Sequence, residues 1–133
     1  MSEKSAILCV DDELLILLSL KQELKNHFGT RFVYEIALNA EEAFEVMREL
    51  EKEGVSLLLI ISDWLMPGIR GDEFLIEACR RFPGVKTVLV TGQADYEAIE
   101  NARALAGLQA CIMKPWNQKE LIRVVEKCAL STG

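Results

Sequence analysis

Four short apolar runs, each followed by polar residues, restrict the fold of this chain more than any other feature. The runs and the residues that follow them are 7–10 before Asp11-Asp12, 57–61 before Ser62-Asp63, 88–90 before Thr91, and 111–113 before Lys114-Pro115. If the runs are parallel strands of one sheet, their polar ends meet at one edge, where open α/β sheets bind ligands. Three carboxylates, a hydroxyl and an ammonium at one edge are typical of a site that holds a divalent cation beside a phosphoryl group.

The pattern between these runs alternates strand and helix from end to end. Besides the first run, we predict strands over 33–38, 55–62, 85–90 and 109–113, and helices over 13–28, 40–53, 71–81, 94–106 and 117 to about 130. Gly29 would end the first helix, and Asn39 and Asn117 would cap two later ones. Strict alternation predicts an α/β fold, a doubly wound parallel sheet of five strands with helices on both faces.

The composition excludes several classes of function. A chain of 133 residues suffices for one domain, and we expect a single domain over 1–133, with 131–133 as a tail or the start of a linker. The net charge of −6 argues against a nucleic-acid partner, which would need clustered Lys and Arg. The N-terminus lacks the apolar stretch of a signal peptide, and no apolar run approaches the ~20 residues that span a bilayer. We therefore expect a cytoplasmic protein with no membrane partner.

The cysteines and the single histidine do not have the spacing of a zinc site. Cys9, Cys79, Cys111 and Cys128 form no CxxC pair, and His27 is the only histidine. We interpret the cysteines as small hydrophobic residues with free thiols. His27 is expected near the C-terminus of the first helix, where the helix dipole favours a positive charge.

The acidic residues at the strand ends favour a cation site. Asp63 follows the most apolar stretch, where an ionised carboxylate is costly unless a cation or hydrogen bonds compensate it. Asp11 and Asp12 are adjacent, and like charges so close raise each other's pKa unless a metal is present. Carboxylate oxygens with a backbone carbonyl and water suit Mg²⁺ or Mn²⁺. Two simpler interpretations stay open: Asp11-Asp12 as a cap of the first helix, and Asp63 with Lys114 as a structural ion pair.

Taken together, the motifs resemble the receiver domain of bacterial two-component response regulators, the CheY-like superfamily, over essentially the whole chain. The resemblance rests on Asp11-Asp12, on Asp63 within the sequence Asp-Trp-Leu-Met-Pro-Gly, on Thr91-Gly92 and on Lys114-Pro115. It implies a flavodoxin-like fold with strand order 2-1-3-4-5. It also implies that Asp63 accepts a phosphoryl group from a sensor histidine kinase or a phosphotransferase. Such a domain is no enzyme beyond its own phosphotransfer and slow autodephosphorylation.

The same resemblance implies how the cation is held. Mg²⁺, or Mn²⁺ in its place, would be bound by Asp12, by Asp63 and by the backbone carbonyl of Leu65, with Asp11 acting through water. In the family, the residue types at Leu65 and Gln93 tune the lifetime of the acyl phosphate. A leucine offers no hydrogen bond to an attacking water, so we expect slower self-hydrolysis than in a Leu65→Asn variant.

The resemblance also implies the roles of the remaining polar residues and the partners. Lys114 would balance charge on the transferring oxygens, Thr91 would donate its hydroxyl to the bound phosphoryl group, and the Lys114–Pro115 peptide would be cis. The signal would pass to an output domain or a downstream protein, or would pair two copies through the fourth helix, fifth strand and fifth helix. Cys111 departs from the family, which usually has an aromatic residue there. Trp116 lies close by in sequence, and we interpret it as packing at the rim.

The first predicted helix is unusually apolar. On a 3.6-residue period, one arc faces the sheet, comprising Ile16, Leu17, Leu20, Leu24 and Phe28. Leu14, Leu15 and Leu18 fall outside this arc. They either tuck under neighbouring loops or form a docking face for the helical bundle of a kinase or phosphotransferase.

Three other functions fit the sequence less well. A phosphohydrolase of the haloacid-dehalogenase type needs an acid two residues after its nucleophile, where this chain has Leu65. An FMN-binding protein needs a Ser/Thr/Gly-rich loop after the first strand, and Asp11-Asp12-Glu13 would repel a phosphate. A pseudo-receiver that signals by protein contacts alone is the alternative within the family. The complete set of acids, Thr91 and Lys114 argues against it.

Overall fold

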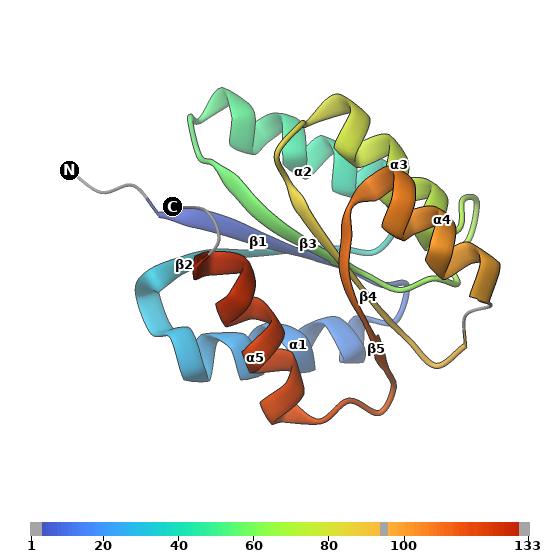
Figure 1. Ribbon diagram of the computed structural model, residues 1–133. Helices are drawn as coiled ribbons and strands as arrows, with labels where there is room; N and C mark the ends of the chain where they lie inside the picture. The colour runs from blue at the N-terminus through green and yellow to red at the C-terminus, as the bar shows by residue number, and fades with distance from the viewer. Residues whose placement is uncertain (1–3, 94–95, 131–133) are drawn as a thin grey trace.

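The computed structural model describes residues 4–93 and 96–130, and this part of the chain forms one parallel sheet flanked by helices (Figure 1). The sheet has the order β2-β1-β3-β4-β5. Its strands are β1 (Ser5–Val10), β2 (Phe32–Ala37), β3 (Leu57–Ser62), β4 (Lys86–Thr91) and β5 (Leu108–Met113). The helices are α1 (Leu14–Phe28), α2 (Ala40–Lys52), α3 (Gly71–Arg81), α4 (Tyr96–Ala106) and α5 (Gln118–Leu130), with a short 3₁₀ turn η1 (Gly29–Arg31). The predicted fold class and strand order are confirmed.

The element bounds agree with the predicted ones to within two residues. The predicted start of the fourth helix at 94 and the predicted tail at 131–133 lie outside the described residues. The strand predicted over 33–38 is present, but its burial does not alternate along the strand: Phe32 and Ala37 are buried, and the four residues between them are half-buried. The reason is that β2 is an edge strand, so neither face is fully covered.

The three inner strands are buried on both faces. In β1, β3 and β4, every residue after the first is buried, as expected for apolar strands inside a parallel sheet. Helices α1 and α5 cover one face, and α2, α3 and α4 cover the other (Figure 1). The polar residues that follow these strands are therefore attached directly to buried backbone, which fixes their positions at the edge of the sheet.

Helix α1 packs by the predicted arc. Leu17, Leu20, Leu24 and Phe28 are buried, and Ile16 is half-buried against the same core. The remaining leucines do not tuck under loops, since exposed fractions are 49% for Leu14, 79% for Leu15 and 47% for Leu18. The helix therefore carries an apolar surface, which we call the α1 leucine face.

The predicted helix ends are confirmed. Gly29 ends α1 with a φ of 59°, a backbone conformation that favours glycine. Asn39 Oδ1 accepts the Glu42 N–H at 2.8 Å. Asn117 Oδ1 accepts the N–H groups of the second and third residues after it, at 2.8 and 3.2 Å.

The cysteines and His27 have the expected structural settings. Cys9 and Cys128 are buried, and the other two cysteines are half-buried. Burial raises the pKa of the Cys9 thiol to about 12, so this thiol is inert. His27 lies in the last turn of α1, with Nε2 3.6 Å from Glu126 Oε2 on α5. Within the described residues, no helix has both the length and the apolar character needed to cross a membrane.

Candidate functional site

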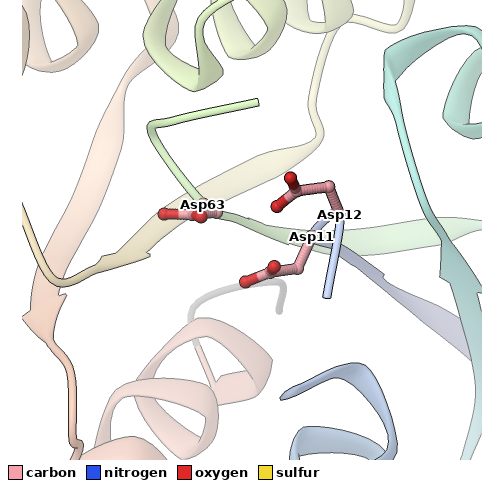
Figure 2. A group of neighbouring side chains, drawn as sticks. All are labelled: Asp11, Asp12 and Asp63. Carbon is pink, nitrogen blue, oxygen red and sulfur yellow. The ribbon is translucent and has the colours of Figure 1, made fainter. Parts of the chain in front are cut away.

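Three carboxylates from two adjacent strands meet at the carboxyl edge of the sheet. Strands β1 and β3 are neighbours, with Val10 opposite Ser62, and the Asp63 N–H donates to the Val10 carbonyl at 3.0 Å. The residues that follow are thereby brought together, as Figure 2 shows: one carboxylate oxygen each from Asp11, Asp12 and Asp63 lies within 4.8 Å of the others. Asp11 and Asp63 are buried and Asp12 is exposed.

Lys114, at the end of β5, completes the charged group. Its Nζ lies 2.7 Å from Asp11 Oδ2 and 3.4 Å from Asp63 Oδ2. Its backbone N–H donates to the Thr91 carbonyl at 2.9 Å, and the Lys114–Pro115 peptide is cis, as expected. Burial alone would lower the pKa of Lys114. The hydrogen bond to Asp11 and the charges of Asp11 and Asp63 outweigh burial and leave this pKa raised, so the ammonium stays protonated.

The site holds more negative than positive charge. Burial raises the pKa of Asp11; the Lys114 hydrogen bond and the Glu13 N–H oppose this effect, and the charge of Asp63 adds to it. Three clustered carboxylates thus face one ammonium, and two of them, Asp11 and Asp63, are buried and contact it. Clustered carboxylate oxygens of this kind fit a hard divalent cation such as Mg²⁺ or Mn²⁺.

A cavity of about 420 Å³ opens beside these groups. Its lining comprises Asp12, Glu13, Asp63, Leu65, Thr91, Gly92, Gln93 and Lys114. The predicted site residues other than Asp11 therefore border one space, and Asp11 contacts Lys114 directly. Glu13 was not predicted. Its place directly after Asp11-Asp12 was the one signal available in the sequence.

The nucleophile candidate Asp63 is oriented by its own loop. The Trp64 N–H donates to Asp63 Oδ1 at 2.8 Å, while Oδ2 is the oxygen nearer Lys114. The Ser62 hydroxyl donates to the Asp63 carbonyl oxygen at 2.9 Å. The two carboxylate oxygens consequently have different neighbours, and Oδ2 is the one that faces the ammonium.

The simpler interpretation of Asp11-Asp12 as a helix cap accounts for only part of their contacts. Helix α1 has Glu13 at its N-cap and no side-chain cap. Asp11 Oδ1 accepts the Glu13 N–H at 2.9 Å, but Asp11 Oδ2 accepts from Lys114. Asp11 therefore both shapes the loop and belongs to the charged group.

Thr91 borders the cavity with its hydroxyl already engaged. Its Oγ1 donates to the Gln93 carbonyl at 3.0 Å and accepts the Gln93 N–H at 3.2 Å. Beside it, a Cβ added to Gly92 would meet only the Lys114 Cβ, at 4.0 Å. The approach past Gly92 is thus open to a small donor molecule.

Cys111 and Trp116 lie outside the cavity lining. Cys111 is half-buried against the core on the α2–α3–α4 face. Trp116 packs against the opposite core, and its Nε1 donates to Glu23 Oε1 on α1 at 2.9 Å. The predicted rim packing of Trp116 is confirmed.

Comparison with known proteins identifies the family. A family model described as the response regulator receiver domain matches residues 7–126. The hydrogenase transcriptional regulatory protein HoxA of Cupriavidus necator is 33% identical over 134 residues, which cover 100% of this chain and 26% of HoxA, so the chain spans about a quarter of that relative.

Solved structures agree with this match. A CheY-like response regulator receiver domain protein from Methanospirillum hungatei is 34% identical with a TM-score of 0.78, over 96% of this chain and 95% of that one. The receiver domain of an HD domain-containing protein from Pseudomonas fluorescens shares the fold, with a TM-score of 0.85 at 23% identity over 97% of both chains. The chain belongs to the response regulator receiver domains, the signalling modules of two-component systems.

Proposed function

We propose that this domain accepts a phosphoryl group on Asp63 from a phosphohistidine of a sensor kinase or phosphotransferase, in a Mg²⁺-dependent reaction in the cytoplasm. One observation carries the proposal: the Asp63 carboxylate has an oxygen within 4.8 Å of carboxylate oxygens of Asp11 and Asp12, and it lies 3.4 Å from the Lys114 ammonium. An ordinary ion pair would need neither the second and third acids nor an open approach past Gly92.

The transfer itself is a displacement at phosphorus. Asp63 Oδ2 would be the oxygen that attacks, because it is the one that faces the Lys114 ammonium, while Oδ1 accepts the Trp64 N–H. A new O–P bond forms as the N–P bond of the phosphohistidine breaks, and the released imidazole takes up a proton. Lys114, close to Oδ2, stabilises negative charge on the transferring oxygens.

The cation would be held by Asp12, Asp63 and the Leu65 backbone carbonyl, with Asp11 acting through water. When bound, Mg²⁺ supplies positive charge beside the phosphoryl oxygens. The protein's own contribution is to keep the carboxylates in place, and the buried Asp11–Lys114 contact of 2.7 Å serves this purpose.

Thr91 would couple phosphorylation of Asp63 to a conformational change at the protein surface. Its hydroxyl would leave the Gln93 carbonyl and donate to a phosphoryl oxygen instead. With Cys111 in place of an aromatic residue, this change would pass through the turn at Thr91–Gln93 to the surface formed by α4, β5 and α5. That surface would control an output domain, a downstream protein or pairing with a second copy.

Acetyl phosphate with Mg²⁺, followed by intact-protein mass, tests the proposal. We expect the native chain to gain one phosphoryl group, and Asp63→Asn or added EDTA to prevent the gain. A native chain that gains no phosphoryl group, or an Asp63→Asn chain that gains one equally well, would contradict it.

The kinase would dock on the α1 leucine face, because α1 starts directly after the Asp11–Glu13 segment and its first turns therefore lie next to the cavity. Leu14→Ser with Leu18→Ser is expected to slow phosphotransfer from the partner kinase and leave the rate with acetyl phosphate unchanged. An unchanged rate with the kinase would refute this docking surface. Leu105→Ser, which removes an exposed leucine of α4, serves as the matched control.

A further inference from the structure

Asp72 is a buried carboxylate that the proposed reaction does not use. It is the second residue of α3 and is only 1% exposed. Its Oδ1 accepts from Arg70 Nε and its Oδ2 from Arg70 Nη2, both at 3.1 Å, so the half-exposed guanidinium grips it with two donors. Oδ1 also accepts the Trp64 Nε1–H at 2.9 Å. The Asp72 carboxylate, in the first turn of α3, therefore binds both Arg70 and the side chain of Trp64, the residue that follows Asp63.

A backbone hydrogen bond also joins the two ends of the loop from Trp64 to Gly71. The Gly71 N–H donates to the Trp64 carbonyl at 2.6 Å. Gly71 also packs so closely that an added Cβ would lie 1.9 Å from the Asp63 carbonyl oxygen. The loop from Trp64 to Gly71 is thus fastened at its ends by one backbone bond and by the Trp64–Asp72–Arg70 contacts, which we call the indole latch.

The indole latch acts on two groups that matter for phosphoryl transfer. Trp64 provides the N–H on Asp63 Oδ1, and Leu65, whose side chain lines the cavity, follows it directly in the loop. Holding the ring of Trp64 therefore holds both the carboxylate orientation and the main chain at Leu65. Displacements of about 1 Å at such a group can slow a reaction on the order of 10²-fold.

Stability alone is a weak reason for this arrangement. An ion pair between a buried carboxylate and a half-exposed guanidinium gives little net stabilisation, because desolvation of the carboxylate offsets the attraction and water screens the guanidinium. Hydrogen bonds to a charged group do fix geometry. The planar Arg70 guanidinium with its two donors and the Trp64 indole N–H can all bind the Asp72 carboxylate in only a few arrangements.

We propose that Asp72 is a positioning residue for phosphoryl transfer, acting through the Trp64 indole to hold the loop that orients Asp63 and carries Leu65. This inference rests on the proposed function. It adds a residue outside the cavity whose effect on the reaction passes through Trp64.

Two variants remove the latch in different ways. Trp64→Phe keeps an aromatic ring and deletes the Nε1–H donor. Asp72→Asn keeps the shape but gives a neutral amide, which accepts more weakly and cannot take both Arg70 donors. Glu77→Gln is the matched control, because it breaks the ion pairs of Glu77 with Arg80 and Arg81 on the same helix, at 3.1 and 2.8 Å, without contact to the loop.

Two measurements report on positioning. The first is amide hydrogen exchange at Trp64 and Gly71 in the metal-free chain. The second is the Mg²⁺ concentration that gives half the maximal rate of phosphorylation by acetyl phosphate. We expect both latch variants to speed exchange at these amides and to raise the half-saturating Mg²⁺ concentration by about 10-fold. In the double variant, the combined effect should be smaller than the sum of the two single effects, because both changes act on the hydrogen bond from Trp64 Nε1 to Asp72.

The outcomes separate the two proposals. If the native chain is phosphorylated and both latch variants behave like Glu77→Gln, or lower only the melting temperature, the positioning role is refuted and the phosphoacceptor role stands. If the native chain takes no phosphoryl group, the proposed function fails and the positioning role fails with it.

Discussion

The segments that follow β3 and β4 border the same cavity but are held in different ways. After β3, the path of the chain is fixed by the close approach of Gly71 to Asp63 and by the Trp64–Asp72 contact. After β4, the Thr91 hydroxyl forms its two hydrogen bonds with Gln93, within its own turn. The segment after β3, which carries Asp63, is thus held by residues of α3. The segment after β4, where Thr91 would respond to the phosphoryl group, is held by hydrogen bonds within its own turn. This difference suits a switch, since the acceptor must stay in place while the responder moves.

Two glycine-to-alanine changes test this difference most strongly. In Gly71→Ala, the new Cβ overlaps the Asp63 carbonyl oxygen, which is backbone and cannot turn away. We expect the free energy of unfolding to fall by about 2 kcal/mol or more, and phosphorylation by acetyl phosphate to slow by about 100-fold.

Gly92→Ala is the partner change on the β4 side. Its Cβ would lie 4.0 Å from Lys114 Cβ, an ordinary van der Waals contact. The free energy of unfolding should therefore change by no more than about 0.5 kcal/mol. Urea unfolding and intact-mass time courses measure both. Equal effects at the two glycines would remove the contrast between the two segments.

Leu65→Asn should give the next largest effect. Leu65 is 47% exposed and lines the cavity, and its side chain offers no hydrogen bond to water. An asparagine would hold an attacking water and speed loss of phosphate by roughly fivefold, equivalent to one hydrogen bond of about 1 kcal/mol. Dephosphorylation after removal of the donor measures this rate. Slower or equal loss in the variant would refute the role of this position.

Asp11→Asn should stabilise the metal-free chain by about 1 kcal/mol or less. Burial raises the folded-state pKa of Asp11 above its unfolded value, so the charged form destabilises the fold at neutral pH. This penalty disappears as the pH falls through the folded pKa. The difference in stability between the native chain and the variant should therefore be largest near neutral pH and should shrink on acidification. Thermal unfolding in EDTA measures this difference. Added Mg²⁺ should stabilise the native chain more than the variant.

Cys111→Ala should have the smallest effect. The half-buried thiol lies outside the cavity lining, so the rate of phosphorylation should stay within about twofold of native. A larger change would mean that β5 influences the acceptor directly, and the contrast between the two segments would need revision. Intact-mass time courses under identical donor and Mg²⁺ concentrations give the comparison.

Sequence reasoning predicted the fold well because its main signals are local. Apolar runs such as 57–61 can hardly lie anywhere but in a covered strand, and residues such as Asn39 cap helices by contacts within one turn. The half-buried pattern of β2 was not predicted, because the burial of an edge strand depends on what covers the sheet there rather than on the strand's own residues.

The convergence of the acids was also predictable, because parallel strands share one carboxyl edge. Asp72 was missed for a different reason. An acid in the first turn of a helix usually faces solvent, where it suits the helix dipole. Its burial depends on the path of the 64–71 loop, which returns the Trp64 indole to a residue eight positions further on. No periodic pattern in the sequence encodes such a contact.

The hydrogen bond between Trp116 and Glu23 has a practical consequence for observing this domain. The chain has two tryptophans, and they occupy separate environments: Trp64 lies behind the proposed acceptor, and Trp116 is fastened to α1. Trp116→Phe leaves the Trp64 indole as the single source of tryptophan emission, with its hydrogen bond to Asp72 intact. Charge changes within the cavity can then be followed in real time and without a label.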